Sequence, residues 1–348
     1  MAIGARNRGV GKRPVRILLA LALLAAALAL AACGEKSEDL SGSPQHFDLT
    51  LDFYPNPDHA GIYVAERKGY FSDAGLDVSI ASPSDPAAPI KEVAAGRTDL
   101  AISYEPEVAL ARDQGLDVVA VGAIVDRPLT SMIWLKGSGI GAIADLKGKT
   151  IATAGIPYQD AYLKTILARA DLTPDDVKTV NVGLGLLPAI IGGKAQAILG
   201  GFRNVEGIDL RLRGKGPVVT PVNQLGVPTY DELVLVAQGE RLADDPEAIR
   251  LFIGALARGT AAAARDPQLA TKAVLDANTS LDPKTTSAEI AATLPLLEPS
   301  ERSRPFGYMD AGQWEEFVGW MRDNSLIDSL PPTSDLLTND YLPGRIPD

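Results

Sequence analysis

The stretch LDFYPNPDHAGIYVAERKGYF, residues 51–71, indicates how this chain folds. It begins as the end of a β-type run, is interrupted by two prolines, and resumes at Gly61 with the apolar spacing of a helix. The interruption places aromatic rings, an amide and one of the two histidines in a single strand-to-helix turn. Open α/β sheets bind their ligands where strands end, so this turn predicts recognition of a flat ligand with a polar edge.

From residue 46 onward, β-type runs alternate with helical patterns. This alternation predicts βα units and a mainly parallel sheet, hence an α/β fold. The predicted strands are 47–54, 76–80, 100–103, 131–135, 150–154, 197–199 and 233–237, and the predicted helices are 59–72, 160–170, 246–265, 268–277, 286–297 and 313–324.

An internal repeat suggests two similar halves. VAAGRTDLAIS at 93–103 resembles IIGGKAQAILG at 190–200, since each reads as a helix end, a glycine, a basic residue and a short apolar strand. A chance match between short segments rich in glycine and alanine is the alternative. The repeat predicts two lobes that face a common cleft, with residues 46–127 and 229–330 in lobe 1, 128–228 in lobe 2, and 331–348 as a C-terminal tail. Hinges are expected near 125–128 and 221–228, where proline or glycine interrupts the strands.

The N-terminus has the pattern of an export signal. Five basic residues precede an uncharged apolar run at 17–32, which ends in small residues before Cys33, the sole cysteine. The run is short for a bilayer span and matches bacterial lipoprotein processing. We therefore predict a lipoprotein signal peptide at 1–32, a lipidated Cys33, a flexible tether at 33–45, and an anchor on the extracytoplasmic face of the cell membrane. An incidental thiol is the alternative for Cys33.

Charge and composition exclude several partners. The 348 residues are 46% hydrophobic, which is typical of a globular protein, and without the signal the chain has 28 basic and 44 acidic residues, a formal charge of −16. This charge argues against nucleic acid, and against an anionic membrane surface except through the lipid. A single cysteine excludes an internal disulfide and a thiolate metal site within the chain.

Catalytic and cofactor motifs are lacking in the sequence. The segment GKT at 148–150 resembles the end of a phosphate-binding loop, but the glycine needed five positions earlier is Ile143 and a strand is predicted afterwards. The two histidines, His46 and His59, lack the partners of a zinc site or a catalytic triad. We therefore expect a ligand-binding protein with no metal and no cofactor.

Several ordered motifs resemble those of the substrate-binding proteins of the thiamine-pyrimidine (NMT/THI-like) group, which have the type II periplasmic-binding fold. The motifs are the stretch at 51–71, GLDV at 75–78, VAAGRTDLAISYE at 93–105, WLKGSGI at 134–140, DLKGKTIA at 145–152, GGFRNVEGIDL at 200–210 and GVPTYDELVLVA at 226–237. The resemblance implies a monomeric binding protein, not an enzyme, that delivers a thiamine precursor such as formylaminopyrimidine or hydroxymethylpyrimidine to an ABC permease and its ATPase.

The same resemblance implies a site between the lobes. Phe53, where tryptophan is usual, would stack on the ligand ring, and Glu206 would accept hydrogen bonds from an aminopyrimidine. Arg203 departs from the family pattern and is compatible with an anionic substituent or an ion pair with Glu206. The full set of implied ligand contacts is Phe53, Tyr54, Asn56, His59, Tyr104, Tyr158, Phe202, Asn204 and Glu206.

Alternatives stay open at the level of sequence. One alternative is a binding protein for another ligand, namely an alkanesulfonate, taurine, nitrate or a riboflavin-like molecule. Another is a thiamine-pyrimidine synthase-like enzyme, although such enzymes use a Cys-rich run that this chain lacks. A surface sensor or scaffold is a third reading. Taken singly, Phe53 and Phe202 also suit a core, His59 suits a bond to backbone, and Glu206 suits a helix N-terminus.

Overall fold

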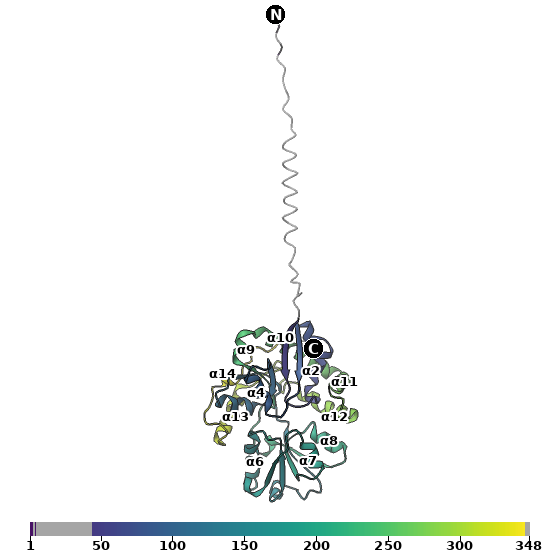
Figure 1. Ribbon diagram of the computed structural model, residues 1–348, viewed down its shortest axis with the longest axis vertical. Coiled ribbons are helices and arrows are strands. Elements are labelled where there is room, and N and C mark those ends of the chain that lie inside the picture. Colours follow the sequence, from purple (N-terminus) through teal and green to yellow (C-terminus); the bar gives the residue numbers. More distant parts are fainter. Residues whose placement is uncertain (3, 5–43, 345–348) are drawn as a thin grey trace. The chain divides into compact units, whose positions relative to one another are not determined.

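The computed structural model describes residues 1–2, 4 and 44–344. Over 44–344 the chain forms two five-stranded sheets with helices packed around each of them (Figure 1). We call the sheet that contains β1, with its helices, the first lobe, and the sheet that contains β6, with its helices, the second lobe. The predicted two-lobed α/β fold is therefore confirmed.

The first lobe is built from both ends of the described segment. Its strand order is β2-β1-β3-β10-β4. The strands are β1 Gln45–Thr50, β2 Leu76–Ala81, β3 Leu100–Ser103, β4 Val118–Val125 and β10 Leu233–Gln238, and the helices are α2 Ala60–Arg67, α3 Tyr70–Asp73, α4 Ala88–Ala94, α5 Glu105–Asp113, α9 Gly239–Asp244, α10 Pro246–Arg265, α11 Pro267–Ala277, α12 Pro283–Thr293, α13 Ala311–Asp323 and α14 Thr333–Leu336, with 3-10 turns η1 Pro57–His59 and η5 Leu294–Leu296.

The second lobe is one continuous insertion between β4 and β10. Its strand order is β7-β6-β8-β5-β9. The strands are β5 Thr130–Leu135, β6 Thr150–Thr153, β7 Lys178–Asn181, β8 Ala197–Phe202 and β9 Pro217–Pro221, the helices are α6 Tyr158–Ala168, α7 Leu186–Ile191 and α8 Glu206–Leu212, and the 3-10 turns are η2 Ile143–Leu146, η3 Pro174–Asp176 and η4 Val222–Leu225.

The two sheets share one topology. The repeated segments 93–103 and 190–200 end in β3 and β8, which are the central strands of their sheets. Strand β3 is parallel to β1 and antiparallel to β10, and β8 is parallel to β6 and antiparallel to β5. The internal repeat therefore marks equivalent strands in the two lobes.

Each sheet is mixed, because one strand runs against the other four, which share the direction expected of a mainly parallel sheet. Each sheet has two parallel and two antiparallel pairings. The antiparallel pairings involve β10 and β5, the first strands formed after the chain crosses between the lobes. The chain enters β10 and β5 from the side of the cleft, whereas it enters the strands of the βα units from the other end of the sheet. β10 and β5 therefore run antiparallel to their neighbours.

Glu232 joins the two crossing segments. Its Oε2 accepts hydrogen bonds from the backbone N–H groups of Leu129 and Thr130 at 2.6 and 2.7 Å, and its Oε1 accepts one from the Thr130 hydroxyl at 2.8 Å. One buried carboxylate therefore holds the outgoing and returning chain together. The hinge function expected near 125–128 and 221–228 stays a prediction.

Helix α10 packs closely against α2 in the first lobe. Asp245 caps α10 by accepting a hydrogen bond from the Ala248 N–H at 3.2 Å. A Cβ placed on Gly259 would lie 2.2 Å from the carbonyl oxygen of Gly61, so the helices meet at two glycines. Phe252 of α10 stacks on Phe47 with ring centroids 5.0 Å apart, which fixes the helix against β1.

Local predictions differ from the structure in several places. Strands β4, β7 and β9 were not predicted, and the strand expected over 47–54 ends at Thr50. The helix expected over 59–72 is divided at Gly69, whose φ of 72° lies in the left-handed region and separates α2 from α3. The expected tail from 331 contains α14 and packs on the first lobe, because Leu336 is buried and Leu337 forms a β-bridge with Ala120.

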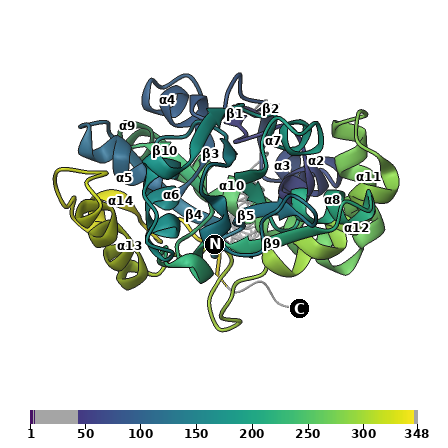
Figure 2. The same ribbon diagram turned by 90° about the horizontal axis from the view of Figure 1, so that it is seen from below.

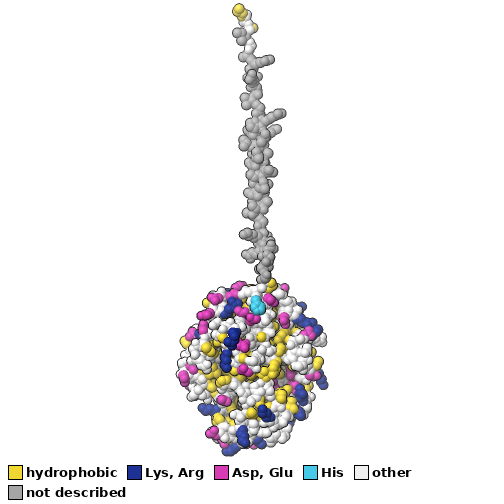
Figure 3. All heavy atoms as spheres, in the orientation of Figure 1, with side chains coloured by type: hydrophobic (Ala, Val, Ile, Leu, Met, Phe, Trp, Pro, Cys, Tyr) yellow, Lys and Arg dark blue, Asp and Glu magenta, His cyan; other side chains and the backbone are white. Residues whose placement is uncertain are grey.

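Nearly all of the predicted signal peptide at 1–32, the predicted lipidation residue Cys33 and nearly all of the predicted tether fall outside the described residues. None of the helices described in the structure is both long enough and apolar enough to pass through a membrane. Acidic and basic side chains are interspersed over the face of residues 44–344 shown in Figure 3.

Candidate functional site

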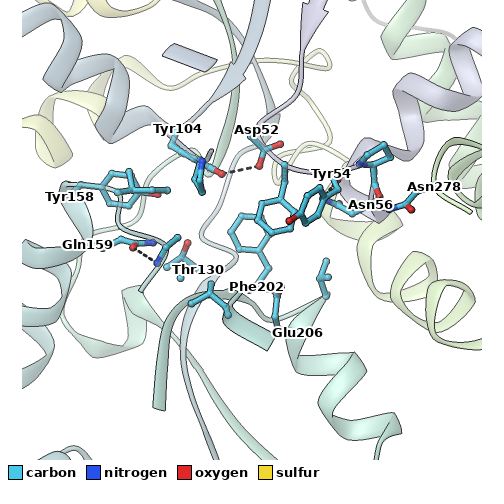
Figure 4. A pocket seen from close by; sticks show the side chains of 18 of the residues that line it. Asp52, Tyr54, Asn56, Tyr104, Thr130, Tyr158, Gln159, Phe202, Glu206 and Asn278 are labelled. Atoms are coloured by element: carbon cyan, nitrogen blue, oxygen red, sulfur yellow. Dashed lines mark hydrogen bonds between the residues drawn. The ribbon is translucent and has the colours of Figure 1, made fainter. Parts of the chain in front are cut away.

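A cavity of about 760 Å³, counted with its opening to solvent, lies where the two lobes meet. Figure 4 shows that side chains from both lobes point toward it. Five aromatic side chains line it, which suits a flat organic molecule. The lining residues are Asp52, Phe53, Tyr54, Pro55, Asn56, Pro86, Tyr104, Thr130, Ala154, Ile156, Tyr158, Gln159, Leu186, Gly200, Phe202, Val205, Glu206, Asn278 and Leu281.

The first-lobe wall is the turn that follows β1. Phe53 and Tyr54 meet edge to face, with ring centroids 4.8 Å apart and an interplanar angle of 69°. Tyr54 is 46% exposed, so it lies at the mouth of the cavity rather than in the core. Asn278, at the end of α11, donates a hydrogen bond to the Pro55 carbonyl at 3.0 Å and so ties the turn to that helix.

Asn56 gives the turn its shape. Its Oδ1 accepts a hydrogen bond from the Asp58 N–H at 2.8 Å, which caps η1, and its Nδ2 donates to the Tyr54 carbonyl at 3.1 Å. Asx side chains commonly stabilise turns in this way. The Asn56 amide therefore makes two hydrogen bonds to backbone groups of the turn, and the same residue lines the cavity.

Asp52 is the most constrained polar group of the wall. Its Oδ1 lies 2.8 Å from His59 Nε2, and its Oδ2 accepts a hydrogen bond from the Tyr104 hydroxyl at 2.9 Å. His59 Nδ1 accepts from the Asn56 N–H at 3.3 Å, so a neutral imidazole carries its proton on Nε2 and donates it to Asp52. The carboxylate is thus held in one orientation beside the cavity.

The second-lobe wall is formed by β8 and the start of α6. Gln159 Oε1 accepts a hydrogen bond from the Ala154 N–H at 3.0 Å, while its Nε2 has no partner among the described residues. A Cβ on Gly200, where φ is 112°, would lie 2.5 Å from that Nε2. Glycine at this position gives the Gln159 amide its space next to the cavity.

Glu206 begins α8 at the foot of this wall. Its Oε2 accepts a hydrogen bond from the Phe202 N–H at 2.7 Å, which ties the carboxylate to the end of β8. Burial raises the pKa of Glu206, and backbone N–H donors oppose that rise. The side chain therefore acts as a helix N-terminal acceptor and also lines the cavity.

Seven of the nine predicted contacts line the cavity, namely Phe53, Tyr54, Asn56, Tyr104, Tyr158, Phe202 and Glu206. The other two do not. His59 is completely buried behind Asp52. Asn204 is buried between the lobes, where its Nδ2 donates to Asp58 Oδ1 at 2.7 Å and to the Thr293 hydroxyl at 2.8 Å. Direct contact with a ligand stays a prediction for all nine.

Sequence reasoning missed several polar lining residues. Asp52 and Gln159 adjoin predicted site residues, and the end of a β-run was the available signal for Asp52. Thr130 and Asn278 carry no local signal, because they reach the cavity from the first residue of β5 and from the end of α11.

The cavity carries negative rather than positive side chains. Its lining includes two carboxyl groups, Asp52 and Glu206, and no lysine, arginine or histidine among the described residues. Arg203 does not line it, and its backbone N–H donates to the Leu129 carbonyl at 3.0 Å. Among the residues described, His, Cys, Asp and Glu side chains form no group of three that suits a metal ion.

Comparison with known proteins relates this chain to several groups. The sequence model described as "NMT1/THI5 like" matches residues 56–270. A protein of Haemophilus influenzae named putative thiamine biosynthesis protein is 35% identical over 82% of this chain and 90% of its own length. The formylaminopyrimidine-binding protein of Halalkalibacterium halodurans is 34% identical over 86% of this chain and 92% of its own.

More distant relatives include enzymes. A protein of Legionella pneumophila named 4-amino-5-hydroxymethyl-2-methylpyrimidine phosphate synthase is 25% identical over 87% of this chain and 94% of its own length. Among solved structures, the alkanesulfonate-binding protein of Xanthomonas axonopodis covers 86% of this chain and 99% of its own, with a TM-score of 0.67 at 15% identity. The last similarity shows the periplasmic-binding fold alone.

Proposed function

The chain belongs to the NMT1/THI5-like family, and we propose that it is a substrate-binding protein for an aminopyrimidine-type thiamine precursor. The relative named formylaminopyrimidine-binding protein supports this ligand class. The protein closes its lobes around the molecule and releases it unchanged, as two-lobed binding proteins do.

The pairing of rings with carboxyl groups in the cavity carries the proposal. Phe53 and Phe202 line the cavity from opposite lobes, and Asp52 and Glu206 line it too. An aminopyrimidine has two faces that stack on aromatic rings and an amino edge that donates hydrogen bonds to carboxylates. Gln159 Nε2 supplies a donor for a ring nitrogen or a formyl oxygen.

An anionic ligand fits this wall less well. Sulfonate and nitrate call for cationic groups or several backbone N–H donors, and two carboxyl groups repel them. Because Arg203 does not line the cavity, it supplies no such cation there. The wall therefore favours the aminopyrimidine over taurine, alkanesulfonates and nitrate.

Binding without catalysis is supported by the position of His59. Both ring nitrogens are engaged, by Asp52 and by the Asn56 N–H, and the side chain is completely buried. Lysine and cysteine do not occur among the described residues that line the cavity. The proposed role is therefore transport rather than the synthase chemistry named for the distant relatives.

Delivery to an ABC permease and its ATPase completes the proposal, with the protein held at the extracytoplasmic face by a lipid on Cys33. The support is the sequence pattern around Cys33. Replacement of Cys33 by serine is expected to release the protein from the membrane fraction after expression in a bacterium that processes lipoproteins. Persistence of the variant in the membrane fraction would contradict the anchor.

A thermal-shift screen tests the ligand class. The probes are formylaminopyrimidine, hydroxymethylpyrimidine, thiamine, riboflavin, taurine, an alkanesulfonate and nitrate. A ligand at a hundred times its Kd stabilises the bound protein by about 2.7 kcal/mol, which raises Tm measurably. We expect the two aminopyrimidines to give the largest shifts, whereas a shift with sulfonate or nitrate alone would overturn the proposal.

A further inference from the structure

A buried cluster of three side chains joins the lobes directly behind the cavity. Asn204 comes from the second lobe, between β8 and α8, whereas Asp58 of η1 and Thr293 of α12 belong to the first. Asn204 Nδ2 donates to Asp58 Oδ1 at 2.7 Å and to the Thr293 hydroxyl at 2.8 Å. Asp58 and Asn204 are each 2% exposed, so these bonds are shielded from water.

The cluster adjoins the cavity on both sides. Asp58 donates its backbone N–H to Asn56, which lines the cavity from the first lobe. Asn204 lies between Phe202 and Val205, which line it from the second. Helices α8 and α12 also lie side by side across the two lobes in Figure 2. The hydrogen bonds of the cluster therefore connect the first-lobe wall of the cavity to the second-lobe wall.

Two buried acceptors in the cluster have no donor. Asp58 Oδ2 and Asn204 Oδ1 make no hydrogen bond to any described residue. Asp58 and Asn204 are also the two side chains that the hydrogen bond from Asn204 Nδ2 to Asp58 Oδ1 joins. A carboxylic acid and an amide can form a cyclic pair in which each group donates once and accepts once. A proton on Asp58 therefore supplies the missing donor, whereas an ionised Asp58 leaves both acceptors unsatisfied, at a cost in stability.

The charges around Asp58 are predominantly negative. Burial raises the pKa of Asp58 to about 8, and nearby carboxylates add to the rise while the Asn204 bond opposes it. None of the described ion pairs includes Asp58. The carboxylates that raise the pKa of Asp58 are Asp52, Glu206 and Glu232, and Asp52 is bonded to His59. The other charged groups on the elements packed around it are Glu66 and Arg67 of α2, Lys272 and Asp276 of α11, Lys284 and Glu289 of α12, and Asp209 and Arg211 of α8 with Arg213 at its end; Asp276 pairs with Arg67 and with Lys272, and Asp209 pairs with Arg213.

We propose that Asp58 is protonated in the closed protein and that the cyclic Asp58–Asn204 pair is a latch that holds the second lobe against the first. The two residues are positioning residues, since neither lines the cavity. The inference rests on the proposed function only in assuming that the cavity binds a ligand, whatever that ligand is. Loss of the proton leaves a buried charge and opens the latch.

The sign of the pH effect follows from the direction of the shift. A carboxyl group whose pKa is higher in the closed protein than in the open or unfolded chain binds its proton more tightly when closed. The stabilisation that the protonated Asp58 gives to the closed protein is fully present below about pH 4, where an ordinary aspartate is also protonated. It is lost as the pH rises toward about 8. Closure is therefore favoured at mildly acidic pH.

Thermal unfolding of the ligand-free protein tests the latch without any assumption about the ligand. The variants are Asp58→Asn, which keeps a cyclic pair at every pH, and the control Asp77→Asn on the exposed side of β2. Between about pH 5 and about pH 9, we expect the Tm of the wild type and of the control to fall by at least about 2 °C more than that of Asp58→Asn. Parallel curves for all three proteins would overturn the proposal.

Infrared spectroscopy tests the proton directly. At about pH 6 the wild type is expected to show a carbonyl band of a protonated carboxylic acid that is missing from Asp58→Asn. Asn204→Ala is expected to shift that band, because the acid loses its amide partner. An identical carboxylic acid region in wild type and Asp58→Asn would overturn the proposal even if Asn204→Ala fails to fold.

Release kinetics connect the latch to the cavity, with formylaminopyrimidine as the probe. We expect its dissociation to become at least about fivefold faster in the wild type as the pH rises through about 8, and to stay nearly constant in Asp58→Asn. A rate independent of pH in both proteins would contradict the latch. If formylaminopyrimidine does not bind, the proposed function fails, while the unfolding and infrared experiments still decide the latch.

Discussion

Asp52 connects three parts of the cavity wall at the scale of single residues. His59 and Tyr104 each hold one of its carboxylate oxygens, and His59 in turn accepts the Asn56 N–H. His59 therefore links the backbone of the turn at 51–58 to the Asp52 carboxylate. Its two ring nitrogens contact the Asp52 carboxylate and the Asn56 N–H, so the ring orients Asp52.

Glu206 is the residue whose charge we expect to matter most for an aminopyrimidine. Glu206→Gln keeps an oxygen for the Phe202 N–H but removes the carboxylate, so binding of formylaminopyrimidine should weaken by at least about 1 kcal/mol. Isothermal titration calorimetry measures the change. Glu240→Gln is a matched control, because Glu240 also lies in the first turn of a helix but does not line the cavity. Equal affinities in both variants would contradict the role of Glu206.

Gln159 provides a second test at the same scale. Gln159→Glu keeps an oxygen that accepts the Ala154 N–H and replaces the free amide donor beside the cavity with a carboxylate oxygen. Because a ligand acceptor then meets another acceptor, we expect affinity for formylaminopyrimidine to fall by about 1–3 kcal/mol. Unchanged affinity, with Tm as a check on folding, would mean that the ligand does not use this donor.

At the scale of elements, the packing of α10 on α2 decides how the first lobe closes over β1. The two helices approach at Gly61 and Gly259, where a side chain has no room. The stacked rings of Phe71, Phe252 and Phe47 lie beside this crossing. The position of α2 matters for the site because the turn that leads into it carries the first-lobe wall.

Alanine substitutions in α10 test this close approach. Gly259→Ala places a Cβ against the Gly61 carbonyl and should destabilise the protein by about 1–3 kcal/mol, as overpacking does. Gly254→Ala is the control, since a Cβ there meets no atom within 4 Å and alanine favours a helix. Urea unfolding measures both. If Gly259→Ala is as stable as Gly254→Ala, the helices are not in the contact described.

At the scale of the whole molecule, buried carboxyl groups make stability depend on pH. Burial raises the pKa of Glu107 to about 7, opposed by a hydrogen bond from Ser103, and the pKa of Asp231 to about 7, opposed by one from Trp314. In the folded protein both pKa values lie above the ordinary range of carboxyl groups. The contribution of these two groups to the free energy of unfolding is therefore full below about pH 4 and is lost as the pH rises through about 7.

The ligand-free protein should therefore be most stable at mildly acidic pH. We expect the free energy of unfolding to fall by more than about 1 kcal/mol between about pH 5 and about pH 8, as measured by urea unfolding at constant ionic strength. Glu107→Gln should flatten the curve, because it removes one titrating group and keeps an acceptor for Ser103. A stability that rises over this range would contradict the raised pKa values.

Much of the fold followed from local patterns, and part of the site did too. The turn at 51–58 and the segment at 202–206 each combine rings with polar groups, and the internal repeat indicated that they belong to facing lobes. Thr130 and Asn278 could not be predicted, because their neighbours in sequence say nothing about the cavity they reach.

The sequence by itself determined the α/β class, the two related lobes and most of the aromatic wall, because hydrophobic period and turn chemistry act over a few neighbouring residues. Only the tertiary structure decided that β10 and β5 run in reverse, that His59 lies behind Asp52, and that Asn204 meets Asp58 across the lobes. These outcomes depend on contacts between residues far apart in the chain, and burial then determines which polar groups pair and which carboxyl groups keep their protons.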